Sequence, residues 1–199
     1  MKVSTLNSGF TLIELTVTTA IVSILSAVAI PSFNESINNN NLSSSATTLL
    51  SELQYARSEA VKRNLPVSIC GSTNSTSCNT SDWEKGRIVF IDDGAGAPAN
   101  AGNGVVNSET ILKVFGKAVS DVSYTPTLFS SAGFLTFSDD GTANTVGTLL
   151  ICDSRSSTDN TLAKAVNVNL SGQARRAYDS DASTDDIVNN LLGINVACP

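Results

Sequence analysis

Hydrophobic residues recur at three different spacings along the chain, and each spacing predicts a different element. The first region is a continuous apolar run from Phe10 to Ile30 that contains a single charged residue, Glu14. As a helix, a run of this length spans about 31 Å, close to the hydrocarbon thickness of a bilayer. We therefore expect residues 10–30 to form a helix that crosses a membrane.

The second region, residues 31–64, is expected to continue this helix. Pro31 lacks a backbone N–H, which predicts a kink or local melting there, and residues 34–45 are rich in the poor helix formers Asn and Ser. Charged residues, among them Glu52 and Arg57, decorate the remainder of the helix. An apolar stripe at spacings of three and four predicts packing on a sheet, and its members are Leu42, Ala46, Leu49, Leu53, Ala56 and Ala60.

The third region, residues 65–199, has short β-like runs separated by loops rich in Gly, Asn, Asp and Ser, and we call it the head. A closing NVAC segment could add a further strand held by Cys198. The fold class is therefore α+β, with one long N-terminal helix packed on a mostly antiparallel sheet or pair of sheets. The expected strands are 66–70, 86–92, 109–115, 133–138, 147–152 and 164–171.

The cysteine positions predict disulfide bonds. All four cysteines follow the apolar run, an arrangement typical of a domain in an oxidising, extracytoplasmic compartment. Three pairings are possible, of which we favour Cys70–Cys78 and Cys152–Cys198. On the chain-entropy model these contribute about 2.5 and about 4 kcal/mol. A zinc site is disfavoured because the chain has no CxxC spacing and no histidine.

Charge and motifs argue against several functions. With 12 basic and 18 acidic residues the net charge is −6, which opposes non-specific attraction to nucleic acid or anionic lipid. The sequence lacks histidine and a GxxxxGK[ST] loop, so we expect no enzyme and no cofactor. Acid pairs occur at 92–93, 139–140 and 185–186; the first two could bind calcium, but the glycine that follows each of them favours a turn.

The start of the chain carries a specific motif. Gly9 precedes Phe10, Glu14 follows four residues later, and Pro31 ends the apolar run. This arrangement resembles the class III signal of type IV pilins and type II secretion pseudopilins. A carboxylate in a membrane helix costs about 2.5–3.5 kcal/mol on insertion scales, so intramembrane acids are by default functional. Here Glu14 lies one helical turn from the amino terminus that cleavage after Gly9 would create.

The resemblance implies a processing and assembly pathway. A prepilin peptidase would remove residues 1–9, and the new amino terminus, Phe10, would be N-methylated. The protein would sit in the bacterial inner membrane with its head in the periplasm, and then enter a pilus or pseudopilus. Its partners would be other pilins, contacted through the N-terminal helix, and the inner-membrane assembly platform. Glu14 would pair with the Phe10 amine of a neighbouring subunit.

The rest of the chain resembles the GspH/FimT-type family of minor pilins and pseudopilins. Four segments match in order, namely LLSELQYARSEAVKRN (49–64), SDWEKGRIVFIDD (81–93), TLLICDSR (148–155) and VNVNLSGQARR (166–176). The resemblance implies a non-catalytic subunit that primes assembly or sits at the tip of a type IV pilus. The alternatives are a pilus-displayed DNA receptor for natural transformation and the GspH-like pseudopilin of a type II secretion system.

The last segment carries the possible DNA-binding residues. Gly172 and Arg175 match a Gly-Arg-x-Arg-like motif, but Gln173 replaces the first arginine; Arg176 and Lys164 could add charge. Adjacent strand residues point to opposite faces, so we do not expect Arg175 and Arg176 to share a surface outside a turn. Four aspartates follow between residues 179 and 186 and would weaken a phosphate site. Assembly is therefore the favoured function.

Overall fold

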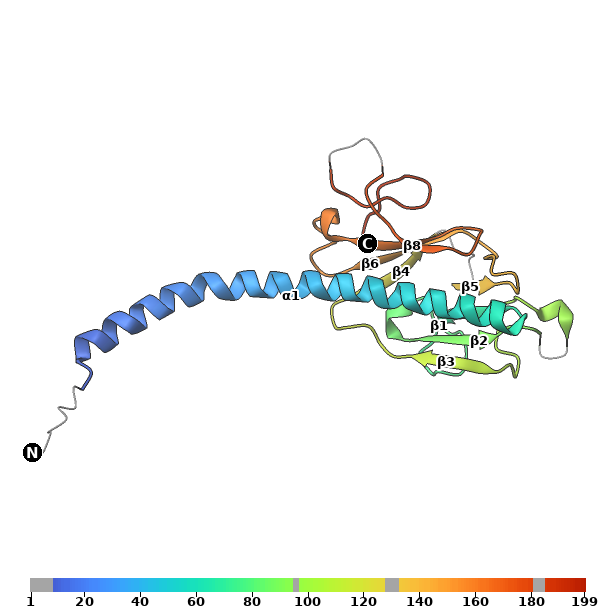
Figure 1. Cartoon of the computed structure of the whole chain (residues 1–199), viewed down its shortest axis with the longest axis horizontal. Coiled ribbons are helices and arrows are strands. Elements are labelled where there is room, and N and C mark those ends of the chain that lie inside the picture. Colours follow the sequence, from blue (N-terminus) through green and yellow to red (C-terminus); the bar gives the residue numbers. More distant parts are fainter. Residues whose placement is uncertain (1–8, 95–96, 128–132, 181–184) are drawn as a thin grey trace, which may run out of the picture. The chain divides into compact units, whose positions relative to one another are not determined.

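The computed structural model of the chain describes residues 9–94, 97–127, 133–180 and 185–199 (Figure 1). The chain forms two compact units, Met1–Asn40 and Asn41–Pro199. Helix α1 (Leu12–Arg63) contributes to both of them.

In the first unit, the large apolar side chains of α1 whose burial is described are exposed, with values from 80% at Leu12 down to 41% at Ile37. By length and composition this helix could cross a membrane. Its threonine and serine hydroxyls donate back to carbonyls three or four residues earlier, as Thr16 and Ser26 do, and so do not need water. The expected local melting at Pro31 is wrong, because the helix is assigned without interruption through this position. A proline removes only one backbone N–H donor, so the loss of one hydrogen bond need not interrupt a helix of this length.

In the second unit, α1 is terminated by a backbone hydrogen bond and a residue in the left-handed conformation. Asn64 has φ of 56°, and the Leu65 N–H donates to the carbonyl of Ala60 at 3.3 Å. This is a Schellman arrangement with asparagine in the left-handed position, and Pro66 prevents the helix from continuing. The predicted apolar stripe is confirmed, since each of its six residues is at most 1% exposed.

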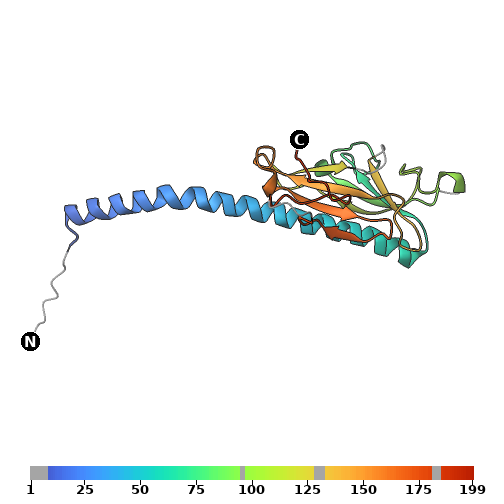
Figure 2. The ribbon, with the colours of Figure 1, turned by 90° about the horizontal axis from the view of Figure 1, so that it is seen from above.

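The head contains two four-stranded antiparallel sheets that α1 covers on one side (Figures 1 and 2). The first sheet has the order β3 (Ile111–Phe115), β2 (Arg87–Ile91), β1 (Val67–Gly71) and β5 (Phe134–Phe137). The second has the order β4 (Ser123–Thr127), β6 (Gly147–Cys152), β7 (Lys164–Val168) and β8 (Ala174–Arg176). Short 3₁₀ turns occur at Trp83–Lys85, Pro98–Asn100 and Asn160–Leu162.

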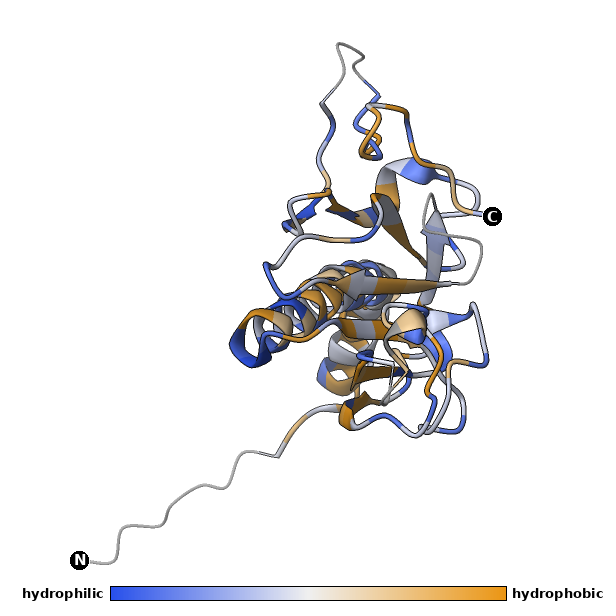
Figure 3. Ribbon diagram, turned by 90° about the vertical axis from the view of Figure 1, so that its right-hand side faces the viewer, coloured by the Kyte–Doolittle hydropathy of each residue, from blue (hydrophilic) through white to orange (hydrophobic). Residues whose placement is uncertain are grey.

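The central strands of both sheets are buried on both faces, whereas the edge strands β3, β4 and β8 are partly exposed. The inner faces join the stripe of α1 in one core, and Figure 3 shows the strands grouped around one side of the helix. The outer face of the first sheet packs under the loops that carry Cys78 and Val106. The outer face of the second sheet packs under the C-terminal segment that carries Ile187 and Val196. Strands β1 and β6 are therefore buried along their whole length.

All six expected strands exist, although 164–171 stops at Val168, where Asn169 begins a tight turn to Gln173. Strands β4 and β8 were not expected. Strand β4 contains Pro126, which is tolerated because β4 lies at a sheet edge. The prediction of a strand in the NVAC segment is wrong, because this segment forms only an isolated bridge between Asn189 and Asn195. Cys198 is held by its disulfide bond to Cys152.

Candidate functional site

The N-terminal segment places its acid in a defined local structure. The backbone N–H of Glu14 donates to the hydroxyl of Thr11 at 3.3 Å, and the N–H of Thr11 faces a Glu14 carboxylate oxygen at 3.5 Å. This reciprocal pair is a capping box, which satisfies two of the N–H groups that the first helical turn leaves without partners. The carboxylate also lies at the positive end of the helix dipole.

The residues predicted for processing lie just before this helix. Gly9 and Phe10 are outside α1 and exposed, with Phe10 at 86%. An exposed peptide bond outside a helix is more accessible to a protease than one inside a helix. The remaining leader residues, including Lys2, lie outside the described residues. Cleavage after Gly9 therefore stays a prediction.

The Glu14 carboxylate can accept further hydrogen bonds beyond the one in the capping box. Its contact with the Thr11 N–H is at the limit of a hydrogen bond, and a carboxylate offers about four lone-pair sites. An ammonium group of a second chain could therefore bind this carboxylate without disrupting the hydrogen bonds that cap the N-terminus of α1. The arrangement can act as an acceptor for a cation at the beginning of α1.

The glycine of the basic motif has a packing role in this fold. Gly172 has φ of +72°, and a Cβ there would lie 1.9 Å from the carbonyl oxygen of Gly141. Arg57 of α1 donates to that same oxygen at 2.8 Å and to the carbonyl of Ser171 at 3.0 Å. Arg57 thus holds the loops after β5 and β7 together, and only glycine fits at position 172.

The basic residues are divided between the two faces of the second sheet. Arg175 lies opposite Asn167 and Arg176 opposite Val166 in neighbouring register positions, so their side chains point to opposite faces of the second sheet. Arg175 donates to the side chain of Gln173 at 2.7 Å. Lys164, two residues before Val166 in β7, shares the face of Arg176.

Both favoured disulfide bonds are present. Cys70 and Cys78 have Cα atoms 5.6 Å apart and are separated by 8 residues, and Cys152 and Cys198 have Cα atoms 6.0 Å apart and are separated by 46. Each bond joins the outer face of one sheet to the segment that covers it.

At least one carboxylate of each acid pair accepts backbone hydrogen bonds within a loop. Buried Asp92 accepts from the N–H groups of Gly102 and Gly104 at 3.0 and 2.8 Å, and Asp140 accepts from Thr142. Asp185 accepts from the N–H of Ile187 at 3.1 Å. Within the described ranges, no group of three or more acidic or cysteine side chains could hold a metal ion.

One feature was missed by sequence reasoning. Glu52 was expected to decorate the helix, but it is 3% exposed and accepts two hydrogen bonds from Arg87 of β2, at 2.5 and 2.7 Å. Arg87 also donates to the carbonyl of Trp83 at 2.7 Å and lies over the ring of Tyr124. Burial raises the pKa of Glu52, and the bonds from Arg87 oppose that rise. The only signal was that Glu52 lies next to the stripe residue Leu53.

Comparisons with known proteins agree with this geometry. A family model described as type II transport protein GspH matches residues 45–172, and a prokaryotic N-terminal methylation motif matches residues 5–30. No curated protein matches the chain significantly.

Two solved structures are similar. The type IV minor pilin FimU of Pseudomonas aeruginosa is 24% identical with a TM-score of 0.52, and the match covers 75% of this chain and 97% of FimU. The minor pseudopilin EpsH of the Vibrio cholerae type 2 secretion system is 12% identical with a TM-score of 0.47, over 68% of this chain and 95% of EpsH. The likeness to FimU shows a shared fold.

Proposed function

The chain belongs to the GspH family of minor pilins and pseudopilins, and on this premise we propose that it is a non-catalytic subunit that primes assembly of a type IV pilus or sits at its tip. The observation that carries the proposal is Glu14, held at the first turn of an apolar helix beside the exposed Phe10. The methylation motif that matches residues 5–30 implies processing by a prepilin peptidase and assembly through this helix.

Before assembly, residues 10–30 anchor the protein in the inner membrane with the head in the periplasm. Removal of residues 1–9 creates an amino group on Phe10, one helical turn from Glu14. The capping box satisfies the carboxylate only in part, so leaving it in the bilayer is costly. Pairing with the Phe10 amine of a neighbouring subunit relieves this cost and favours docking on the assembly platform.

The partner machine has a second candidate. The matching family model is described as a type II transport protein, which favours a pseudopilus of a type II secretion system. The N-terminal motif resembles that of subunits of both machines, so the pairing proposed here applies to either. The DNA-receptor alternative gains no support from the head, because Arg175 and Arg176 point to opposite faces and the chain is acidic.

The test is a Glu14→Ala variant in a strain that builds filaments. We expect cleavage after Gly9 to continue and incorporation of the protein into filaments to fall at least about tenfold, since a charged pair is lost. Glu35→Ala, at another exposed acid of the same helix, is the matched control and should assemble normally. Normal amounts of the Glu14→Ala protein in filaments would overturn the pairing mechanism.

A further inference from the structure

Strand β3 lies at the outer margin of the first sheet, and one of its edges has no strand beside it (Figure 1). It pairs only with β2, in a ladder that is regular from Lys113 to Phe115. The strand contains no proline, and its residues Lys113 and Val114 are exposed. An open edge of this kind can pair with another chain, and proline is one of the means by which proteins prevent such pairing.

The hydrogen-bond pattern shows which backbone groups of β3 face outwards. The N–H of Ser72 donates to the carbonyl of Gly86, so two residues further along β2 Ile88 also bonds to β1. Val114 lies opposite Ile88, and its N–H and C=O therefore point away from β2. Within the described residues, no hydrogen bond outside the β2–β3 ladder reaches the backbone of residues 111–117. A donor and an acceptor on one residue of an open edge match an added strand.

The face of β3 towards α1 carries a cation without a counter-ion. The ammonium group of Lys113 lies 4.9 Å from the centre of the Tyr55 ring and 5.1 Å from that of Phe115. Glu52 lines the same hollow and is influenced by the charge of Lys113, but it is already paired with Arg87. Lys113 forms no ion pair with an acid in the described part of the chain. The hollow thus presents two aromatic rings and one unbalanced positive charge.

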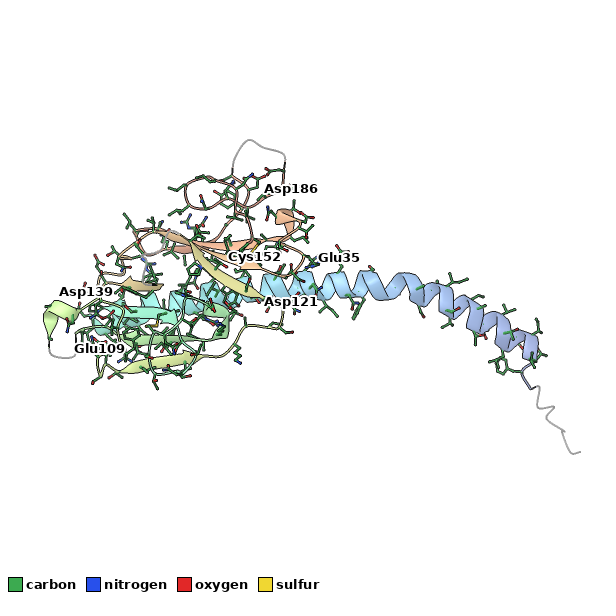
Figure 4. The ribbon with its side chains drawn as sticks, turned by 180° about the vertical axis from the view of Figure 1, so that it is seen from behind. Glu35, Glu109, Asp121, Asp139, Cys152 and Asp186 are labelled. Atoms are coloured by element: carbon green, nitrogen blue, oxygen red, sulfur yellow. A yellow bond between two sulfur atoms is a disulfide. The ribbon has the colours of Figure 1, made fainter. Side chains whose placement is uncertain are left out.

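The chain itself offers no partner for this edge among its described residues. Glu109, just before β3 (Figure 4), is 9% exposed and accepts the N–H of Gly94 at 2.8 Å, so its carboxylate stabilises the preceding loop. A second copy of β3 is a poor partner, because antiparallel pairing of two copies places both Lys113 ammonium groups on one face of the joined sheet. The edge therefore suits a strand of a different sequence that carries an acid.

We propose that the outer edge of β3 binds an extended segment of a different protein subunit, which adds to the first sheet as an antiparallel strand and places an acid beside Lys113. In this pairing, one residue of the partner exchanges two hydrogen bonds with Val114. The partner residue before it lies beside Phe115 and the one after it beside Lys113, both on the face towards α1. The partner sequence is therefore an apolar residue, a β-branched residue and an acid, in that order. This contact does not depend on the proposed function.

The experiment is an NMR titration of the isotope-labelled full-length chain in detergent micelles with the end-blocked peptide Ser-Thr-Leu-Val-Glu-Thr-Ser, up to about 5 mM. The largest amide shifts should occur at Val114 and its neighbours in β3. A peptide with Gln in place of Glu should bind about two- to fivefold more weakly, since it loses an exposed ion pair. A peptide N-methylated at its Val should not bind, because the N–H that donates to the Val114 carbonyl is removed.

Two protein variants separate the backbone from the charge. Val114→Pro removes an N–H that is not part of the ladder with β2, and proline is tolerated at such an edge position, so this variant should fold and lose binding. Val114→Thr keeps the N–H and is the matched control, which should bind. Lys113→Gln should bind the Glu and Gln peptides equally.

Several outcomes would overturn the proposal. These are no binding of the Glu peptide, equal binding of the N-methylated peptide, shifts centred outside β3, or a preference for Glu that survives Lys113→Gln. Shifts of Val114 that follow protein concentration alone would show that two copies pair, which also overturns it. If Val114→Pro does not fold, the N-methylated peptide still decides, because the protein is then unchanged. Cleavage and filament incorporation report on the proposed function separately.

Discussion

The carboxylate of Glu52 and the guanidinium of Arg87 form a two-bonded ion pair in which both side chains are 3% exposed. This pair joins α1 to the first sheet at a place where neither group can reach water. The cation of Arg87 is further bonded to the carbonyl of Trp83, so removal of the acid would leave a buried positive charge without its counter-ion.

We expect Glu52→Ala to lower the free energy of unfolding by about 3–5 kcal/mol. The double variant Glu52→Leu/Arg87→Met should lose less than Glu52→Ala alone, because it removes both charges. Urea denaturation curves measure both values. A double variant that is less stable than Glu52→Ala would contradict this account.

Gly172 and Gly193 offer a matched pair, since their φ angles are +72° and +73°. A Cβ at Gly193 would meet nothing within 4 Å, whereas one at Gly172 would lie 1.9 Å from the Gly141 oxygen. Gly193→Ala should therefore cost about 1 kcal/mol for the left-handed backbone alone. Gly172→Ala should cost clearly more in thermal denaturation, and equal losses would exclude a packing role for Gly172.

The two disulfides should contribute unequally. Cys152→Ser/Cys198→Ser opens a loop of 46 residues and Cys70→Ser/Cys78→Ser a loop of 8, which the chain-entropy model values at about 4 and about 2.5 kcal/mol. Because the longer loop also covers an apolar sheet face, its loss should increase binding of an apolar dye. The opposite order of stabilities would show that strain or denatured-state structure dominates.

Acid should weaken the head through Asp153. Burial acts to raise the pKa of this carboxyl, but hydrogen bonds from Arg155 and Ser156 outweigh burial and hold the pKa below its ordinary value of 3.8. A carboxyl with a lowered pKa in the folded state stabilises the protein fully above the ordinary value, and this stabilisation is lost as the pH falls towards the folded-state pKa.

We therefore expect melting temperatures measured from about pH 6 down to about pH 2 to fall less steeply for Asp153→Asn than for wild type. Asp153→Asn should also be less stable at neutral pH, because it loses the charged bond to Arg155. Parallel pH profiles of the two proteins would contradict this role of Asp153.

Sequence reasoning succeeded where one local pattern decides the structure. The stripe from Leu42 to Ala60 predicted the buried face of α1, and six apolar runs predicted six strands. It failed where tertiary contacts override local preference. Strand β4 was not predicted, since its Pro126 is disfavoured inside a sheet, and β8 is only three residues long and depends on its pairing with β7.

The candidate site divides in the same way. The motif of Gly9, Phe10 and Glu14 is recognised from its spacing along the chain. Thr11 and Glu14 have the Thr-x-x-Glu spacing that is typical of a capping box, which the structure contains. The ion pair of Glu52 could not be predicted, because its partner is 35 residues away and reaches it only when β2 packs on α1. The packing of Gly172 against Gly141 depends likewise on two distant loops.

The unequal spacing of the cysteines sets the order in which the two disulfide bonds can form as the chain emerges during synthesis. Cys70 meets its partner after 8 further residues, whereas Cys152 must wait for 46. A chain that emerges amino terminus first can therefore seal its first sheet while the second sheet still lacks its cover. During that interval the Cys152 thiol is open to mispairing and the apolar sheet face beside it is uncovered, so the rate of thiol oxidation helps to determine how much of the chain folds correctly.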